Sequence, residues 1–299
     1  MKNNKVLMVT YFYATEGCCP AEWADDKVDA IREMGKDTIL LTSIFSKKNT
    51  LKSVKHYRVL SLSIQDLRHE LDEIRKEKMP IPFIQLMLIL PFILTVGLGL
   101  DLLQKLITSG NGGGKWSWAF PASICSFYLA LRYNCKQIFT TGGPASAHLA
   151  GAFVAVLTGR WLVCELQDPL TGKDIGRTPN SAKLLGLAEK VIMNTADRVV
   201  FVTKSAAEYA QSKYDNSKAQ IVAIYPGSKF FTQSKDNREI ATNKITMIHL
   251  GTLYSTRNFN TLIQSIDELI DETQRMSGAA LIKPAQVYKN WPKKTLRMQ

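Results

Sequence analysis

The chain has 299 residues, of which 45% are hydrophobic and 21% charged, a composition typical of globular proteins with one large or two medium domains. This composition argues against an intrinsically disordered chain. Lys and Arg number 38 against 26 Asp and Glu, and the formal net charge of +12 favours an anionic partner: a nucleotide, a phosphosugar, a nucleic acid or an acidic membrane face.

The first part of the chain alternates between strand and helix patterns. Its predicted elements are a strand at 6–12, a loop at 13–20, a helix at 24–34 and a strand at 38–42. Strand, helix and strand in this order predict a parallel sheet covered by helices. The apolar start resembles a signal peptide only superficially, because Thr10 and Glu16 interrupt it and no small-residue cleavage site follows.

An apolar insert is predicted at 79–131. Its first part, 79–100, contains no charge and is long enough to span a bilayer. A single span would separate the strand at 6–12 from one predicted at 137–140, although both have the pattern of one sheet. A hairpin with 116–131 as its second span would hold three prolines in or near the spans. We expect helices partly embedded in a membrane face, with a plain buried insert as the equal alternative.

The alternation resumes after the insert. Strands are predicted at 137–140, 161–164, 198–202 and 220–225, with helices at 145–157, 181–194 and 204–213. A strand at 245–250 and a helix at 258–270 would then begin a second βα domain. We therefore predict an amino-terminal domain at 1–230, a polar linker at 231–243, and at 244–299 an incomplete or unusually small second domain with an irregular tail.

Cysteine and histidine spacings give no support for a metal. The five cysteines are an odd number at no zinc-ligand spacing, which favours a reduced compartment, and the four histidines are scattered. We predict neither a metal nor a cofactor.

Open parallel sheets bind ligands beyond the carboxyl ends of their strands, so four loops contain candidate ligand-binding residues: 13–20, 141–148, 165–172 and 251–257. In the first, Glu16 and Gly17 place a glycine where the backbone can approach a sugar or phosphate closely, although a mere turn is an equal alternative. In the second, Gly142 and Gly143 precede a helix start that exposes N–H groups. His148 follows in its first turn, as a catalytic candidate or a packing residue.

The third loop contains two carboxylates, Glu165 and Asp168, directly after a buried strand. Carboxylates at such a place can orient sugar hydroxyls or stabilise positive charge on a sugar ring, although Asp-Pro also begins many turns. The glycine-rich stretch 109–116 is no nucleotide P-loop, since Ser109 and Trp116 occupy positions that need Gly and Ser or Thr.

With these segments assembled, the chain resembles the family 4 glycosyltransferases that have a subfamily 4-like amino-terminal domain, over roughly residues 3–272. The segments that carry the resemblance are the opening strand and glycine loop at 9–17, a turn similar to S-P-P-x-S-x-H-L-x-G at 141–151, a segment similar to D-x-R-D-P at 165–169, a strand similar to A-D-x-V-x-x-x-S/T at 196–203, and a segment similar to G-x-L…K/R-N at 250–258.

The resemblance implies a GT-B fold: a Rossmann-like acceptor-side domain, here complete, and a second Rossmann-like domain, here represented by its first βα unit. It implies that Gly251 and Arg257 contact the diphosphate of a nucleotide-sugar donor. Acceptor-side substrate contacts fall at Glu16, Gly17, Gly142, Gly143 and Glu165, and catalytic candidates are Asp168 and His148. Two departures are the cysteine pair 18–19 in place of the family's second glycine, and the lack of the paired glutamates eight residues apart that grip the donor.

We therefore expect a glycosyltransferase that transfers a sugar from a nucleotide-sugar donor to a glycan or lipid-linked acceptor in cell-surface polysaccharide synthesis. A non-catalytic module that binds an acceptor or a partner enzyme is the alternative. We expect a cytoplasmic protein, with the anionic inner face of the plasma membrane as a candidate peripheral site. Nucleic acid is not an expected partner, because the basic residues are dispersed.

Overall fold

The computed structural model describes residues 5–15, 18–49, 51–80, 83–108, 115–172, 178–227 and 262–269. The chain divides into two compact units, Met1–Phe231 and Thr232–Gln299. In the second unit residues 262–269 are helical, within the helix predicted at 258–270. The linker and the strand predicted at 245–250 lie outside the described residues.

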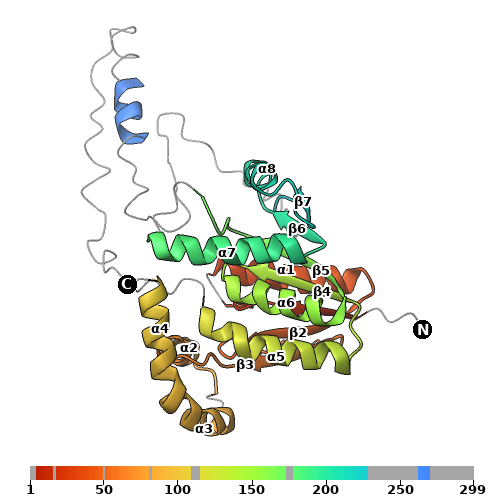
Figure 1. Cartoon of the computed structure of the whole chain (residues 1–299), viewed down its shortest axis with the longest axis vertical. Coiled ribbons are helices and arrows are strands. Elements are labelled where there is room, and N and C mark those ends of the chain that lie inside the picture. The colour runs from red at the N-terminus through yellow and green to blue at the C-terminus, as the bar shows by residue number, and fades with distance from the viewer. Residues whose placement is uncertain are drawn as a thin grey trace, which may run out of the picture. The chain divides into compact units, whose positions relative to one another are not determined.

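The first unit is built on a parallel sheet of seven strands in the order β3-β2-β1-β4-β5-β6-β7 (Figure 1). The strands are β1 (Lys5–Val9), β2 (Asp37–Ser43), β3 (Val54–Val59), β4 (Gln137–Gly142), β5 (Trp161–Leu166), β6 (Arg198–Phe201) and β7 (Gln220–Ala223). The predicted α/β, Rossmann-like class is confirmed. The direct pairing of β1 with β4 also confirms that the strands on either side of the insert belong to one sheet.

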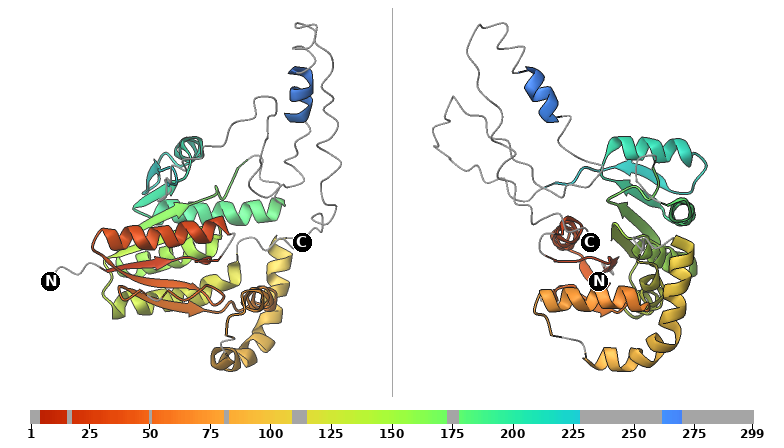
Figure 2. Two further views of the ribbon diagram at one scale, coloured as in Figure 1. Left: turned by 180° about the vertical axis from the view of Figure 1, so that it is seen from behind. Right: turned by 90° about the vertical axis from the view of Figure 1, so that its left-hand side faces the viewer.

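Helices cover both faces of this sheet. They are α1 (Cys19–Glu33), α2 (Ile64–Lys76), α3 (Phe83–Phe92), α4 (Leu98–Thr108), α5 (Trp116–Arg132), α6 (Ala145–Thr158), α7 (Pro179–Thr195) and α8 (Lys204–Lys213). Helices α5, α6 and α7 lie side by side on one face, and α1 lies on the other (Figures 1 and 2). This arrangement follows from right-handed crossovers, which change face where the strand order reverses.

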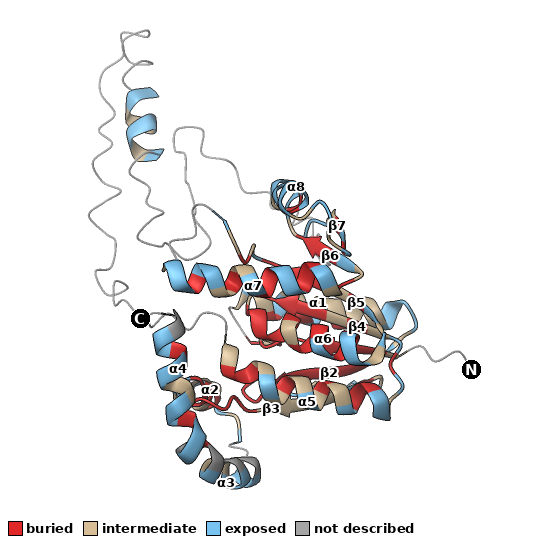
Figure 3. Ribbon diagram, in the orientation of Figure 1, coloured by how far each residue is buried: buried red, intermediate tan, exposed pale blue. Residues whose placement is uncertain are grey.

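The core lies where the sheet is covered on both faces (Figure 3). Leu7, Met8 and Val9 of β1 are fully buried, as expected for a central parallel strand. Gly151 lets α6 approach β4 closely, because a Cβ at this position would overlap the methyl group of Thr140.

Three elements differ from the sequence-based expectations. β3 was not predicted, although 54–59 is rich in β-branched and aromatic residues. β1 ends at Val9 rather than at 12, and α1 begins at Cys19 rather than at 24. Pro20 is compatible with the earlier start, since proline is tolerated in a first helical turn, where its missing N–H would have no partner.

The apolar stretch 79–100 does not form one helix. Pro91 lies in the last turn of α3, and a π-helical turn (Ile93–Gly97) then joins α3 to α4. Proline removes a backbone donor and commonly interrupts a helix in this way. Among the described residues, no helix combines the length and apolar character needed to cross a membrane. Several apolar side chains of α3 and α4 are exposed, so the insert is not a plain buried one.

Candidate active site at the carboxyl edge of the sheet

The strand order reverses between β1 and β4, and the chain leaves these two strands toward opposite faces. Such a switch point opens a crevice for ligands at the carboxyl edge of an open sheet. Gly142 ends β4 there with a φ of 124°, a backbone conformation that residues other than glycine rarely adopt. The Oγ1 atom of Thr10, which follows β1, lies 3.5 Å from where a Cβ of Gly142 would be. The glycine turn 142–143 therefore lies at the expected ligand position.

His148 supports this turn from within the protein. The side chain is fully buried. Its Nδ1 lies 2.8 Å from Thr140 Oγ1, and its Nε2 lies 3.2 Å from the Gly142 carbonyl oxygen. A carbonyl only accepts, so Nε2 carries the proton and Nδ1 accepts from the Thr140 hydroxyl. Burial lowers the pKa of His148 to about 4, which keeps the ring neutral near pH 7.

Both ring nitrogens of His148 thus make hydrogen bonds within the protein. This geometry favours a positioning role, in which His148 holds the Gly142 carbonyl and with it the glycine turn. The catalytic role expected from the sequence would require one nitrogen to leave its present partner and reach a ligand.

The Glu165 side chain is buried where β4, β5 and α1 meet. Its Oε2 accepts a hydrogen bond of 2.6 Å from the Thr141 hydroxyl, and the ammonium of Lys27 on α1 lies 2.8 Å from its Oε1. A buried carboxylate needs such a cation and donor to offset its lost hydration. Glu165 therefore fixes α1 to the ends of β4 and β5.

Gln167 contributes an acceptor that is not used within the described part of the chain. Its Nε2 donates to Thr141 Oγ1 at 3.1 Å and to the Pro20 carbonyl at 3.4 Å. Its Oε1 is buried and has no hydrogen-bond partner among the described residues. A buried acceptor without a donor costs about 1–3 kcal/mol, so this oxygen is suited to a hydroxyl supplied by a ligand or a water molecule.

Asp168 is the exposed carboxylate of the site. Its Oδ2 lies 3.9 Å from where a Cβ of Gly143 would be, which places the carboxylate beside the glycine turn. Within the described ranges, no hydrogen bond or ion pair to this carboxylate is found. The two acidic residues thus differ: Glu165, near the end of β5, is paired with protein groups, and Asp168, in the loop after β5, faces the solvent.

The fold brings together Gly142, Gly143, His148, Glu165 and Asp168 of the residues singled out from the sequence. Glu16, Gly17, Gly251 and Arg257 lie outside the described residues. In the described part, no group of three or more His, Cys, Asp or Glu side chains is arranged to hold a metal ion.

Sequence reasoning missed Lys27, Thr141 and Gln167 as site residues. Thr141 and Gln167 stand inside segments already singled out, and polar side chains at the end of a buried strand were a usable signal. Lys27 gave no such signal, because it meets Glu165 only through the folding of α1 against the sheet.

Comparison with known proteins gives limited similarity. No protein-family model and no curated protein matches the chain. Among solved structures, sucrose-phosphate synthase from Thermosynechococcus elongatus is similar over 75% of this chain and 48% of its own, with 13% identity and a TM-score of 0.43. A shorter chain of the same enzyme is similar over 75% of this chain and 90% of its own, with 14% identity and a TM-score of 0.40. The chain spans about half the length of the first of these structures. Membership of family 4 stays a prediction.

Proposed function

We propose that the protein is a glycosyltransferase, or the acceptor-side part of one. It would transfer a sugar from a nucleotide-sugar donor to a glycan or lipid-linked acceptor in cell-surface polysaccharide synthesis. The observation that carries the proposal is the position of the Asp168 carboxylate beside the glycine turn 142–143, at the switch point of a Rossmann-like sheet.

The chemistry of this edge suits a hydroxyl-rich ligand. The Asp168 carboxylate and the Gln167 Oε1 atom are acceptors for sugar hydroxyls. α6 begins beside them without a side-chain cap, so N–H groups of its first turn are donors directed at the same place. A sugar hydroxyl both donates and accepts, and it can use both kinds of group.

Asp168 is the catalytic residue we propose, since an exposed carboxylate can accept the proton of an attacking hydroxyl or stabilise positive charge on a sugar ring. Glu165 and His148 are positioning residues in this scheme. Gly142 and Gly143 bring the backbone close to the acceptor, and Glu16 and Gly17 are proposed contacts on the loop after β1. Gly251 and Arg257 are the proposed contacts of the donor diphosphate, a group that arginine binds well.

A non-catalytic module that binds an acceptor or a partner transferase is the second candidate. It is favoured by the engagement of His148 and Glu165, which make their hydrogen bonds and ion pair within the protein. Under either candidate we place the protein on the cytoplasmic side of the plasma membrane, where nucleotide sugars and lipid-linked acceptors meet.

The test uses the full chain. Binding of a panel of nucleotide sugars is measured by titration calorimetry up to millimolar concentration, and release of nucleoside diphosphate is measured with a membrane lipid extract as the source of acceptor. Asp168→Asn should abolish release while leaving donor binding unchanged. Asp215→Asn changes an exposed aspartate in the turn before β7, away from the site, and should have no effect.

Absence of both donor binding and nucleotide release would reject the transferase. Binding of a lipid-linked acceptor without release, and its loss in Asp168→Asn, would instead support the acceptor-binding module.

A further inference from the structure

Helix α4 exposes apolar side chains and buries polar ones. Its Leu98, Leu102, Leu103 and Leu106 side chains are between 52% and 67% exposed, while the polar Gln104 is only 9% exposed. The Asp101 carboxylate is also used by the protein, 3.2 to 3.3 Å from the backbone nitrogen of Gln65 at the start of α2. A helix at a water-facing surface would turn these polar groups outward and its leucines inward. The outward face of α4 is therefore suited to apolar surroundings.

Helix α3 continues this apolar face. Its Phe83, Ile84, Met87 and Leu88 side chains are between 47% and 76% exposed. Figure 3 shows the exposed residues along both helices. We call the following eight residues the apolar docking surface: Phe83, Ile84, Met87, Leu88, Leu98, Leu102, Leu103 and Leu106. Exposed apolar side chains in such number on two successive helices favour an interaction site over an ordinary solvated surface.

The charges around the apolar docking surface indicate its partner. Between residues 78 and 116, which include both helices, the sequence contains one acidic residue, Asp101, and three basic ones, Lys78, Lys105 and Lys115. The single acid is directed at Gln65, whereas Lys105 is exposed between the outward leucines and Lys78 is exposed just before α3. Long lysine side chains can lay their stems on an apolar surface and reach anionic headgroups. An anionic lipid surface complements both features, apolar side chains and positive charge.

The apolar docking surface is anchored at the carboxyl edge of the sheet. A Cβ at Gly97, in the π-helical turn between the two helices, would lie 3.0 Å from the carbonyl oxygen of Leu62, in the loop after β3. This loop leaves the same edge of the sheet as the glycine turn 142–143. Figure 2 shows α3 and α4 joined at an angle at this end of the unit. Contact with a membrane here would bring the candidate site to the lipid headgroups.

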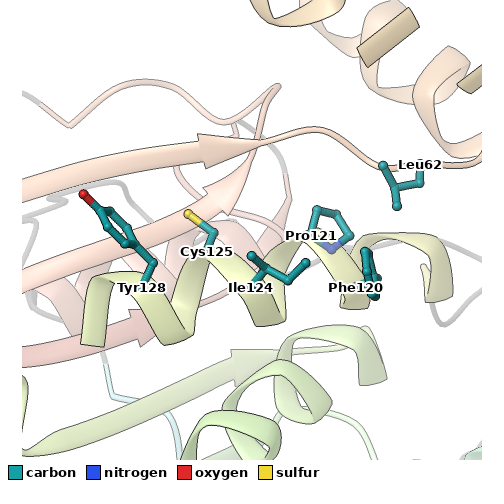
Figure 4. A pocket seen from close by; sticks show the side chains of 6 residues that line it. All are labelled: Leu62, Phe120, Pro121, Ile124, Cys125 and Tyr128. Atoms are coloured by element: carbon teal, nitrogen blue, oxygen red, sulfur yellow. The ribbon is translucent and has the colours of Figure 1, made fainter. Parts of the chain in front are cut away.

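A shallow groove lies beside this anchor. It has a volume of about 400 Å³ and is lined almost wholly by apolar atoms of Leu62 and of the α5 residues Phe120, Pro121, Ile124, Cys125 and Tyr128. In Figure 4 these side chains line the space between α5 and the loop that contains Leu62. Phe120, Ile124 and Tyr128 are exposed aromatic or aliphatic groups of the kind found at membrane interfaces. The groove extends the apolar character of this end of the unit onto α5.

We propose that the apolar docking surface lies in the interface of an anionic lipid bilayer, with α3 and α4 parallel to the membrane rather than across it. The partner is the lipid itself, and binding needs no sugar transfer. The proposal therefore goes beyond the glycosyltransferase function, and the two can fail separately.

The experiment is flotation of the full chain with vesicles, without any nucleotide sugar. The chain should float with vesicles of phosphatidylcholine and phosphatidylglycerol, should bind phosphatidylcholine alone more weakly, and should lose binding as salt is raised. Leu102→Glu and Leu106→Glu should each lower the partition coefficient at least about tenfold, because each removes an exposed leucine that would enter the bilayer interface and adds a negative charge.

Met34→Glu is the matched control. Met34 is 69% exposed at the end of α1, at the opposite edge of the sheet, and its replacement adds the same charge. It should leave vesicle binding within about twofold of the original chain, whereas any loss equal to that of the leucine variants would overturn the proposal. All replaced side chains are exposed, so circular dichroism should show unchanged folding.

Two further outcomes reject the lipid proposal. If the full chain floats with neither kind of vesicle, the apolar docking surface does not bind lipid. If sedimentation shows a dimer that Leu102→Glu dissociates, and no vesicle binding is found, the same surface is an interface between two copies of the chain.

Discussion

Glu70 should make the stability of the first unit depend on pH. The carboxyl group is fully buried, with Oε1 accepting from the Ser61 hydroxyl at 2.6 Å and the Tyr11 hydroxyl at 3.1 Å, and Oε2 accepting from the Ser61 N–H at 3.0 Å. Burial raises the pKa of Glu70 from 4.5 to about 7, against the opposing effect of these hydrogen bonds.

Proton linkage determines whether the free energy of unfolding rises or falls with pH. The pKa of Glu70 is 4.5 in the unfolded chain and about 7 in the folded chain, so between these values only the folded chain keeps the proton. The stabilisation that results is complete below pH 4.5 and is lost as pH rises through 7. The difference corresponds to about 3 kcal/mol in total, of which about 2.5 kcal/mol is lost between about pH 5 and about pH 8.

Glu70→Gln isolates this effect. Glutamine has the same shape, its oxygen can accept from the Ser61 N–H, and its amide group can donate to the hydroxyls of Tyr11 and Ser61, which rotate to accept. Urea denaturation, followed by circular dichroism at about pH 5 and at about pH 8, gives the free energy of unfolding. The original chain should lose about 2.5 kcal/mol more than the variant between them. Parallel pH profiles would show that Glu70 titrates normally and would refute the reasoning.

Three further predictions concern packing, the site and a helix cap. Gly151→Ala should lower the free energy of unfolding by about 1–3 kcal/mol in thermal denaturation, because the new Cβ overlaps Thr140. The control Gly186→Ala on α7, where the nearest atom would lie 3.8 Å from the new Cβ, should be neutral or slightly stabilising. Thr141→Val keeps the shape but removes the hydroxyl that donates to Glu165 Oε2 and accepts from Gln167 Nε2. It should cost about 1–3 kcal/mol and weaken acceptor binding more than donor binding in calorimetry, and equal effects on both ligands would contradict this role. Ser63→Ala removes the N-cap of α2, whose hydroxyl accepts from the Asp66 N–H at 3.1 Å, and should cost about 1 kcal/mol in urea denaturation, whereas Ser123→Ala inside α5 should cost less.

The sheet and its helices were largely predictable because the signals are local. The strands at 38–42, 137–140, 161–164 and 198–202 are short apolar runs next to turn residues, and each appears in the structure within about two residues. The strand at 54–59 was missed because His56 and Arg58 interrupt its apolar pattern. As an edge strand of the sheet, β3 needs fewer apolar residues than the central strands do.

The candidate site was predictable in its position and not in the roles of its residues. The loops after β1, β4 and β5 follow from strand order and a general rule for parallel sheets. The sequence treats Glu165 and Asp168 alike, as two carboxylates after one strand. Their difference depends on Lys27 and Thr141, which only folding brings to Glu165.

Local patterns were sufficient to predict a parallel α/β sheet, because the hydrophobic period of each element depends on neighbouring residues only. Which side chains are buried depends on contacts between distant parts of the chain. The sequence of α4 has the same leucine pattern whether its leucines face the core or the outside; in the structure α4 packs against α7 and α2 with Gln104 buried and the leucines exposed. The same holds for His148, whose fully bonded ring depends on the distance between α6 and β4. Periodicity defines a face of a helix, and the contacts between distant parts of the chain define what that face meets.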